Sequence, residues 1–143
     1  MIPLVLASAS PARLATLKAA GVEPSVPDEA VRRWQAMRGR VGVLHTGHCL
    51  RDTGVDRQAV ATGSTVVHFA DVTDDEIAAY VASGEPLQVA GAFTIDGLGG
   101  AFVTRIEGDH HNVVGLSLPL LRDLLAELGH AWTDLWSHRE RYR

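Results

Sequence analysis

The chain has 143 residues, of which 46% are hydrophobic and 21% charged, and its formal net charge is −4. This length and composition are typical of one globular domain with its own hydrophobic core. The negative balance gives no general attraction to nucleic acid or to an anionic membrane surface, so neither is an expected partner.

The cysteine content and the apolar runs bear on where the protein works. Cys49 is the single cysteine, which excludes an internal disulfide framework and suits a reducing compartment. The N-terminal residues lack the pattern of a secretory leader, and no apolar run reaches about 18 residues. We therefore expect a cytoplasmic protein.

The first predicted elements are a strand, Leu4–Ala7, and a helix that follows it directly. Ser10 stands where a helix N-cap stands, and Pro11 fills the first helical position, where its missing N–H costs nothing. Free backbone N–H groups and the positive end of the helix dipole then meet near Ser8 and Arg13. These residues alone allow either a phosphate site made by Ser8, Ser10 and Arg13 or an ordinary helix start, and they favour the ordinary start.

A second helix is predicted over Pro27–Arg38, with Val31, Trp34 and Met37 on one side and Gly39 as its end. The spacing of these apolar residues matches the helical repeat. This side of the helix is therefore expected to face the core.

Two long strands, Val41–Leu50 and Gln58–Phe69, are predicted to form a hairpin across a polar turn. His45 and His48 are separated by an odd number of positions, which sends their side chains to opposite faces of a strand. Cys49 lies in an apolar run and is predicted to be a small core residue. This histidine spacing and the single cysteine argue against a zinc protein and against a cysteine nucleophile.

A third helix is predicted to begin at Thr73, which forms a capping box with Glu76, and to carry Ile77, Tyr80 and Val81. Gly84 is expected to end it. The glycine-rich stretch from Glu85 to Gly100 is predicted to be a long loop whose backbone closely approaches another group.

The last predicted elements are a strand over Ala101–Ile106, a turn, and a helix over Pro119–Leu128 that ends at Gly129. The buried face of this helix is expected to carry five leucines: Leu120, Leu121, Leu124, Leu125 and Leu128. The turn contains the adjacent residues His110 and His111, and we do not expect a metal site there. The charged residues at 139–143 are expected to form a solvated tail.

Three stretches, in this order, resemble the Maf-like proteins (septum formation inhibitor Maf, nucleoside triphosphate pyrophosphatases). Leu4–Arg13 is similar to the family signature Ser-x-Ser-Pro-Arg-Arg. Ser83–Gly99 resembles the central motif, and Ile106–Leu116 the C-terminal motif. Three motifs in order are far more specific than one, and the resemblance covers the chain up to about Trp136.

The resemblance implies an α/β fold, a twisted mixed β-sheet flanked by helices with two lobes around a cleft, as one domain over 1–136 with a tail at 137–143. It implies that Ser8, Ser10 and Arg13 bind phosphate. It also implies hydrolysis of a nucleoside triphosphate to the monophosphate and pyrophosphate by water attacking the α phosphorus, with Mg²⁺ or Mn²⁺. A homodimer is a further expectation from the family.

The central motif bears on the substrate. Ile95-Asp96-Gly97 stands where pyrimidine-directed members carry Ile-Gln-Gly, so dTTP, UTP or modified nucleotides are the expected substrates. Asp96 could accept a hydrogen bond from the edge of a base, bind a metal ion or position a water molecule. It could instead only stabilise a glycine turn, and the sequence does not favour either a functional or a structural role.

The other carboxylates in the motifs are predicted to have mainly structural roles. Glu85 and Glu107 match motif positions, but each precedes a turn residue and is expected to stabilise that turn. Glu107 or Asp109 as a metal ligand is the less favoured reading. Asn112 also matches the family and is expected to link its loop to the last helix.

The chain departs from the family pattern in three places. Ala12 replaces the first motif arginine, and Val89 replaces a lysine. Several dozen family residues, including the catalytic aspartate and lysine, have no counterpart between Val26 and Pro27, so the catalytic residues of this chain are unknown. Either a segment has been left out of the sequence there, which we favour, or the chain is a truncated relative.

These departures keep two rival functions open. One is a non-catalytic nucleotide-binding or cell-division regulatory protein that retains the phosphate site. The other is a relative of the inosine triphosphate pyrophosphatases, which would show a preference for purines.

Overall fold

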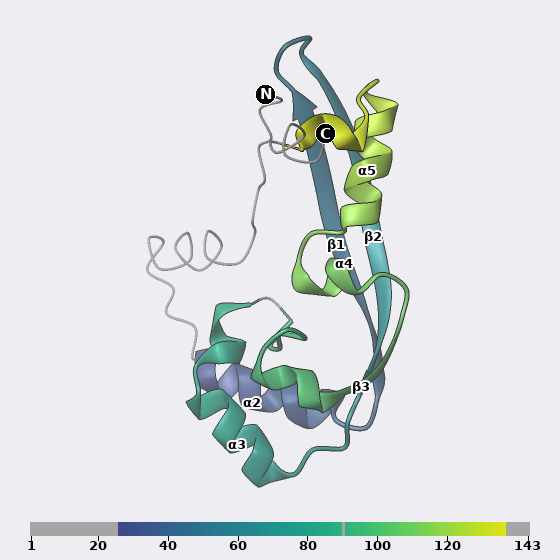
Figure 1. Ribbon diagram of the computed structural model, residues 1–143. Helices are drawn as coiled ribbons and strands as arrows, with labels where there is room; N and C mark the ends of the chain where they lie inside the picture. Colours follow the sequence, from purple (N-terminus) through teal and green to yellow (C-terminus); the bar gives the residue numbers. More distant parts are fainter. Residues whose placement is uncertain (1–25, 90, 137–143) are drawn as a thin grey trace.

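The computed structural model describes residues 26–89 and 91–136 (Figure 1). The predicted strand and helix before Gly21, the phosphate-binding residues Ser8, Ser10 and Arg13, and the tail at 137–143 lie outside the described residues. A long hairpin connects two groups of helices, one at its base and one beside its upper half. No described helix is long and apolar enough to cross a bilayer.

The hairpin consists of β1 (Val41–Asp52) and β2 (Arg57–Phe69), which pair antiparallel from Val41 opposite His68 to Asp52 opposite Arg57. A short third strand, β3 (Val103–Glu107), pairs antiparallel with the base of β2. The predicted α/β class and the hairpin are confirmed. The described strands form an antiparallel sheet in the order β1-β2-β3, and not the predicted mixed sheet.

Burial alternates along both strands, because successive side chains point to opposite faces of the sheet. Thr65 and Val67 of β2 are each 1% exposed, whereas Val41 and Val43 of β1 are more than half exposed. Cys49 lies on this outer face and is exposed, so its prediction as a core residue is wrong. Leu50, the next residue in the same apolar run, takes the buried position instead.

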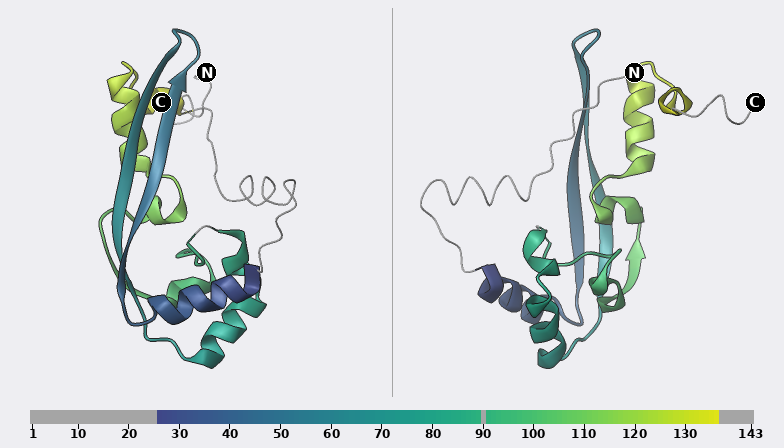
Figure 2. Two further views of the ribbon diagram at one scale, coloured as in Figure 1. Left: turned by 180° about the vertical axis from the view of Figure 1, so that it is seen from behind. Right: turned by 60° about the vertical axis from the view of Figure 1, so that its left-hand side comes forward.

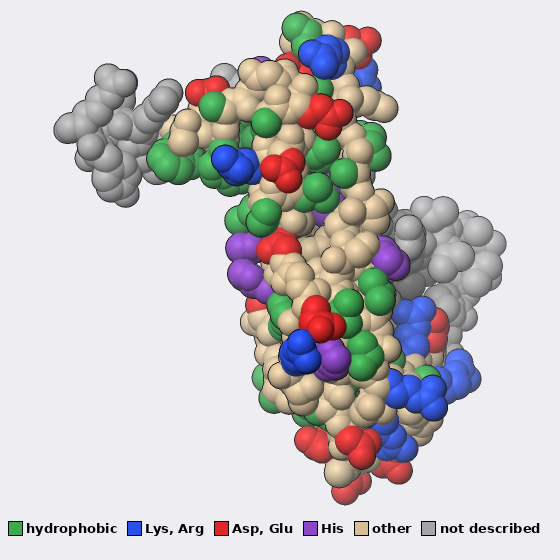
Figure 3. Space-filling model, turned by 90° about the vertical axis from the view of Figure 1, so that its right-hand side faces the viewer, with side chains coloured by type: hydrophobic (Ala, Val, Ile, Leu, Met, Phe, Trp, Pro, Cys, Tyr) green, Lys and Arg blue, Asp and Glu red, His purple; other side chains and the backbone are tan. Residues whose placement is uncertain are grey.

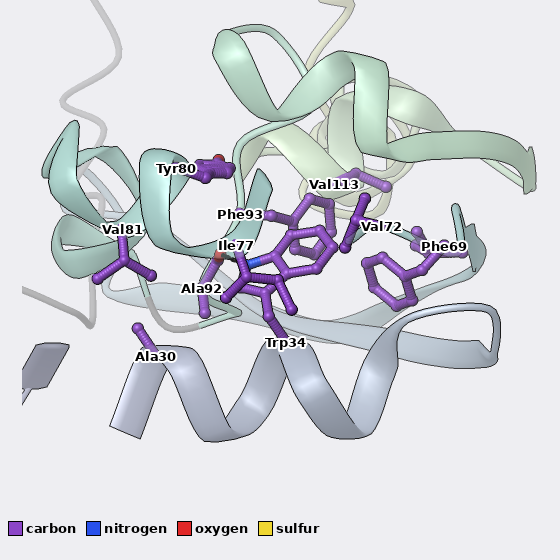
Figure 4. Packing of buried hydrophobic residues seen from close by; sticks show 11 residues of the cluster. Ala30, Trp34, Phe69, Val72, Ile77, Tyr80, Val81, Ala92, Phe93 and Val113 are labelled. Atoms are coloured by element: carbon purple, nitrogen blue, oxygen red, sulfur yellow. Dashed lines mark hydrogen bonds between the residues drawn. The ribbon is translucent and has the colours of Figure 1, made fainter. Parts of the chain in front are cut away.

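The core at the base of the hairpin is built around α2 (Val26–Met37), which begins with the consecutive residues Val26 and Pro27. Trp34 is 1% exposed, and its indole N–H donates to the carbonyl of Ala92 at 2.7 Å. Its ring meets that of Phe69 edge-on at 5.6 Å between centroids (Figure 4). The ring of Phe102 also lies edge-on to it, at 5.7 Å between centroids. The predicted core face of this helix is confirmed.

Helix α3 (Asp74–Ala82) packs on α2 at the base of the molecule. Its capping box is present as predicted, with the Thr73 hydroxyl accepting from the Glu76 N–H and the Glu76 carboxylate accepting from the Thr73 N–H. Gly84 follows the helix with a φ of +79°. A left-handed φ of this kind favours glycine, which explains why the helix ends there.

The second core lies along the upper half of the hairpin. It joins α5 (Leu118–Glu127) to Leu50 and Ala59 of the sheet through four leucines: Leu121, Leu124, Leu125 and Leu128. Figure 2 shows α5 and the short α4 (His110–Val114) along the same side of the hairpin. The 3₁₀ turn η3 (Trp132–Leu135) follows α5. The leucine face predicted from the sequence is confirmed.

Candidate functional site

A carboxylate organises the glycine-rich loop between α3 and β3. Glu85 begins the 3₁₀ turn η1 (Glu85–Gln88) and accepts hydrogen bonds from the Tyr80 hydroxyl at 2.8 Å and from the Thr94 hydroxyl. It also accepts from the backbone N–H groups of Leu98 and Gly99 at 2.9 and 3.0 Å, at the start of η2 (Leu98–Phe102). Glu85 therefore stabilises a turn, as predicted, and fastens both ends of the loop to α3.

The charge of Glu85 is strongly favoured in this setting. The Thr94 hydroxyl, with the N–H groups of Gly99 and Leu98 and the Tyr80 hydroxyl, outweighs the opposing effect of burial and holds the pKa of Glu85 at about 2. Burial, in turn, raises the pKa of the Tyr80 hydroxyl, which keeps it protonated as a donor. The carboxylate is thus an acceptor at every physiological pH.

The glycines of the loop allow this close packing. A Cβ added at Gly97 would lie 2.7 Å from Oε2 of Glu85 and from Oγ1 of Thr94, and one added at Gly100 would lie 2.7 Å from the carbonyl oxygen of Ile95. Real Cβ atoms essentially never approach so closely. The predicted close backbone approach in this loop is therefore confirmed, and its partner is the chain itself.

Asp96 lies in the middle of this fixed loop and is exposed. Within the described parts of the chain its carboxylate makes neither a hydrogen bond nor an ion pair. The turn that surrounds it is held by Glu85 and Thr94 instead. The geometry therefore does not support the structural alternative, in which Asp96 stabilises the glycine turn through a hydrogen bond.

The backbone leading into the loop is strained at one position. Ala92 is 3% exposed and has a φ of +61°, a left-handed conformation that is costly for a residue with a Cβ. The hydrogen bond from the Trp34 indole to the Ala92 carbonyl fixes this conformation. The aromatic core at the base thus holds the loop at Ala92, while Glu85 joins the beginning of the loop to Leu98 and Gly99.

A pocket of about 430 Å³ adjoins the same segment. Its walls come from α2, the base of β1 and the Gly91–Phe93 turn, and they are apolar at Met37, Leu44 and Phe93. Arg33 and Arg40 also line it, and Figure 3 shows basic side chains gathered near this end of the molecule. Apolar walls with a few charged groups are typical of small-molecule sites.

A second cluster lies at the start of α4. Asp109 caps this helix by accepting from the N–H groups of His111 and Asn112 at 3.2 and 3.1 Å. Asp109, His110 and His111 each offer one ligand atom, and these atoms all lie within 4.8 Å of one another. In the described ranges this is the group of His, Cys, Asp and Glu side chains that could hold a metal ion.

Asn112 fastens this cluster to the sheet. It is 1% exposed, and its side-chain amide donates to the Leu44 carbonyl at 3.3 Å and to the Thr65 hydroxyl at 3.2 Å. The Thr65 hydroxyl donates in turn to the carbonyl of Asp109. Asn112 therefore links α4 to β1 and β2, and not to the last helix as the sequence suggested.

The cluster does not fit the Mg²⁺ or Mn²⁺ expected from the resemblance. Magnesium prefers oxygen ligands, and manganese sites share that preference, whereas this cluster has one carboxylate and two imidazoles. Glu107, the other carboxylate considered as a ligand, pairs with Arg105 and His68 at 2.9 and 3.3 Å. The described residues thus offer no oxygen-rich cation site.

Sequence reasoning singled out Asp96 but missed the residues that hold its loop. Tyr80 was expected only in the core and Thr94 was not considered, although both bond to Glu85. Tyr80 lies in a helix and Thr94 in a loop, so no helical or strand repeat relates the two residues. His110 and His111 next to Asp109 were a visible signal, but they were set aside because they lie in a turn.

Comparison with known proteins identifies the relatives of this chain. A family model described as Maf-like protein matches residues 23–128. Proteins named nucleoside triphosphate pyrophosphatase from Salinispora tropica, Streptomyces coelicolor and Streptomyces avermitilis are 67%, 62% and 60% identical over 115, 118 and 119 residues. These alignments cover 80–83% of the chain but 51–58% of each relative, so the chain spans about half the length of the curated relatives it matches.

Proposed function

The chain belongs to the Maf-like protein family, and from that premise we propose that it hydrolyses a nucleoside triphosphate to the monophosphate and pyrophosphate. The chain spans about half the length of the relatives, so this activity is a proposal for the chain. The observation that carries the proposal is the loop of the central motif. Glu85 fixes this loop, and the exposed carboxylate of Asp96 has no partner among the described residues.

Asp96 is proposed to act on the substrate in one of two ways. An ionised carboxylate only accepts hydrogen bonds, so it can accept from an N–H on the edge of a base. It can also orient or deprotonate the attacking water, since hydrolysis at phosphorus depends mainly on positioning and charge. The pyrimidine nucleotides dTTP and UTP, and modified nucleotides, are the proposed substrates because of the motif around Asp96.

The apolar pocket near the loop supports binding of a nucleotide. A nucleobase has flat apolar faces, and the triphosphate carries several negative charges. Met37 and Phe93 offer apolar contact, and Arg33 and Arg40 offer positive charge at the same pocket. Arg33 also pairs with Glu29 at 2.7 Å, so Arg40 is the better candidate for contact with phosphate.

The experiment that tests the proposal is turnover of a nucleotide panel by the whole chain. Pyrophosphate and monophosphate are measured with dTTP, UTP, dCTP, ATP, GTP and ITP, each with Mg²⁺, Mn²⁺ or EDTA. Release of pyrophosphate that falls at least tenfold in Asp96→Asn supports the proposal. The matched control is Asp75→Asn, an exposed aspartate in the first turn of α3, which should leave turnover unchanged.

A second function, nucleotide binding without turnover, is favoured by specific features. Ala12 and Val89 replace basic residues of the family motifs, and the segment with the family's catalytic aspartate and lysine has no counterpart between Val26 and Pro27. Saturable binding of dTTP without release of pyrophosphate would establish this function and contradict hydrolysis. A clear preference for ITP would instead indicate the inosine triphosphate pyrophosphatase reading.

The predicted extra segment between Val26 and Pro27 stays a prediction, and the intact mass of the purified protein tests it. A mass of 15.3 kDa means that the two residues are consecutive in the protein, as they are in α2. A mass several kilodaltons larger means that the purified protein carries additional residues, which we predict to lie between Val26 and Pro27. The cytoplasmic location, the homodimer and the divalent cation are further parts of this proposal, which fractionation, sedimentation and the EDTA arm test.

A further inference from the structure

We propose that Asp109, His110 and His111 form a binding site for one divalent transition-metal ion of the Zn²⁺ class. The inference does not depend on the proposed hydrolysis. It rests on three side chains whose ligand atoms lie within 4.8 Å of one another at the turn between β3 and α4. Neutral imidazole and carboxylate are ordinary ligands of Zn²⁺, and three protein ligands leave a coordination position open.

The two histidines are close together and their ring nitrogens are largely free. Their rings lie 3.9 Å apart between centroids, with an interplanar angle of 36°. Nδ1 of His111 lies 3.3 Å from Oδ1 of Asp109. His110 makes no hydrogen bond or ion pair to any other described residue and is exposed, so its ring can turn toward an ion shared with His111.

The carboxylate of Asp109 can serve as a ligand despite its role as a helix cap. Its two oxygens accept from the N–H groups of His111 and Asn112, and the Ser117 hydroxyl also bonds to it, so an ion would take the place that the His111 ring now occupies beside Oδ1. The same two bonds occupy two of the free N–H groups at the start of this short helix. The site is therefore a cluster of side-chain ligands and not an anion site at a helix end.

The backbone beneath the cluster is fixed from the sheet side. The Thr65 hydroxyl donates to the carbonyl of Asp109 at 2.9 Å, and the buried side chain of Asn112 joins α4 to Leu44 and Thr65. Gly108, with a φ of +114°, makes the turn that leads into the site. Groups placed around a ligand in this way stiffen metal sites, because they orient the ligating side chains in advance.

A bound ion would connect the end of β3 to the first turn of α4. Such a connection stabilises the folded chain by an amount that grows with the logarithm of the free metal concentration above the dissociation constant, because the unfolded chain does not hold the three ligands together. Mg²⁺ is a poor occupant because two of the three ligands are nitrogens. The site is thus chemically distinct from the Mg²⁺ or Mn²⁺ expected for hydrolysis.

The test is calorimetric titration of the whole chain with ZnCl₂ and, separately, with MgCl₂, in a buffer that does not bind metals, at pH 7.5. We expect one equivalent of Zn²⁺ to bind and Mg²⁺ to bind at least a hundredfold more weakly. His110→Ala and His111→Ala should each weaken Zn²⁺ binding at least tenfold. Asp109→Asn, which retains a good helix cap while removing the charge, should weaken it by a similar factor.

The matched control is His45→Ala, which removes an exposed histidine from the outer face of β1, where it bonds to Ser64. Its affinity for Zn²⁺ should equal that of the unchanged chain. Thermal unfolding provides a second readout, since Zn²⁺ should raise the Tm of the unchanged chain and of His45→Ala but not that of His111→Ala. Zn²⁺ binding that survives both histidine substitutions, or that His45→Ala removes, overturns the proposal.

Discussion

The two hydrophobic cores of this molecule share one hairpin but are built from different side chains. The core at the base collects aromatic rings from several elements, with Trp34 and Phe69 edge-on at 5.6 Å and Phe69 and Phe93 edge-on at 5.2 Å. The upper core is made almost entirely of leucines from α5 against Leu50 and Ala59. Aromatic contacts depend on direction, whereas leucine packing depends mainly on filled volume.

The difference explains where the candidate site lies. At the base, the indole of Trp34 holds the strained Ala92, and Tyr80 joins Glu85 in holding the loop of Asp96. The upper core contains no comparable hydrogen bond from a core side chain to a loop among the described residues. A core that positions a loop therefore needs polar atoms on its large side chains, and the base core has them.

The largest expected effect is at Trp34. Trp34→Ala removes a side chain that is 1% exposed, and we expect a loss of about 4–5 kcal/mol in the free energy of unfolding, measured by urea denaturation. Trp34→Phe keeps an aromatic ring but loses the bond to Ala92, and should cost about 2 kcal/mol. Equal losses in the two variants would contradict the role given to the indole N–H.

The next effect is in the upper core. Leu125 is fully buried, and Leu125→Ala should cost about 3 kcal/mol through the cavity it leaves. Hydrogen exchange should show faster exchange in α5, while α2 and α3 keep their protection. Faster exchange in all three helices to the same extent would mean that the two cores are one cooperative unit, which would break the comparison.

A smaller loss is expected at Glu85. In Glu85→Gln, one carboxylate oxygen becomes an NH₂ group, so the side chain can no longer accept from both Leu98, which donates to Oε2, and Gly99, which donates to Oε1. We expect about 1–2 kcal/mol of destabilisation, because Glu85 is partly exposed and water replaces some of the lost bonds. NMR should show the amide signals of Leu98 and Gly99 shifted. Glu107→Gln, at an exposed strand end, is the control and should change stability by less than about 0.5 kcal/mol.

The smallest effect is a dependence on acid. Glu85 has a pKa of about 2 when folded and an ordinary value of 4.5 when unfolded, so the unfolded chain binds its proton first as the pH falls. Its contribution to stability is complete above pH 4.5 and is lost as the pH falls toward about 2. Urea midpoints measured across this range should fall less steeply in Glu85→Gln than in the unchanged chain. Identical slopes would contradict the assignment.

The sequence predicted those parts of the fold that depend on local or periodic signals. The capping box at Thr73 involves residues three apart, and the leucines of α5 repeat with the helical period, so both were predicted and confirmed. The hairpin was found from its two apolar runs and the turn between them. Each of these signals lies within one or two adjacent elements.

Long-range contacts could not be predicted in the same way. Cys49 and Leu50 are adjacent in one apolar run, and only the register against β2 decides which of them is buried. Glu85 was expected to stabilise a turn, but its partners Tyr80 and Thr94 come from a helix and from a loop. Asn112 bonds to Leu44, 68 residues away, which no spacing rule connects. The candidate site depends on these contacts, so it was predicted less completely than the fold.

The outer edge of β1 has a practical consequence for anyone who concentrates this protein. Among the described strands, β1 has a neighbour on one side only, and the outward positions along its 12 residues carry one charged side chain, Arg51. Exposed valines and an unpaired row of backbone groups form a template on which another extended chain can add. Storage conditions should therefore be chosen by light scattering, and Cys49→Lys, at an exposed outward position that does not line the pocket, is the substitution that should extend shelf life.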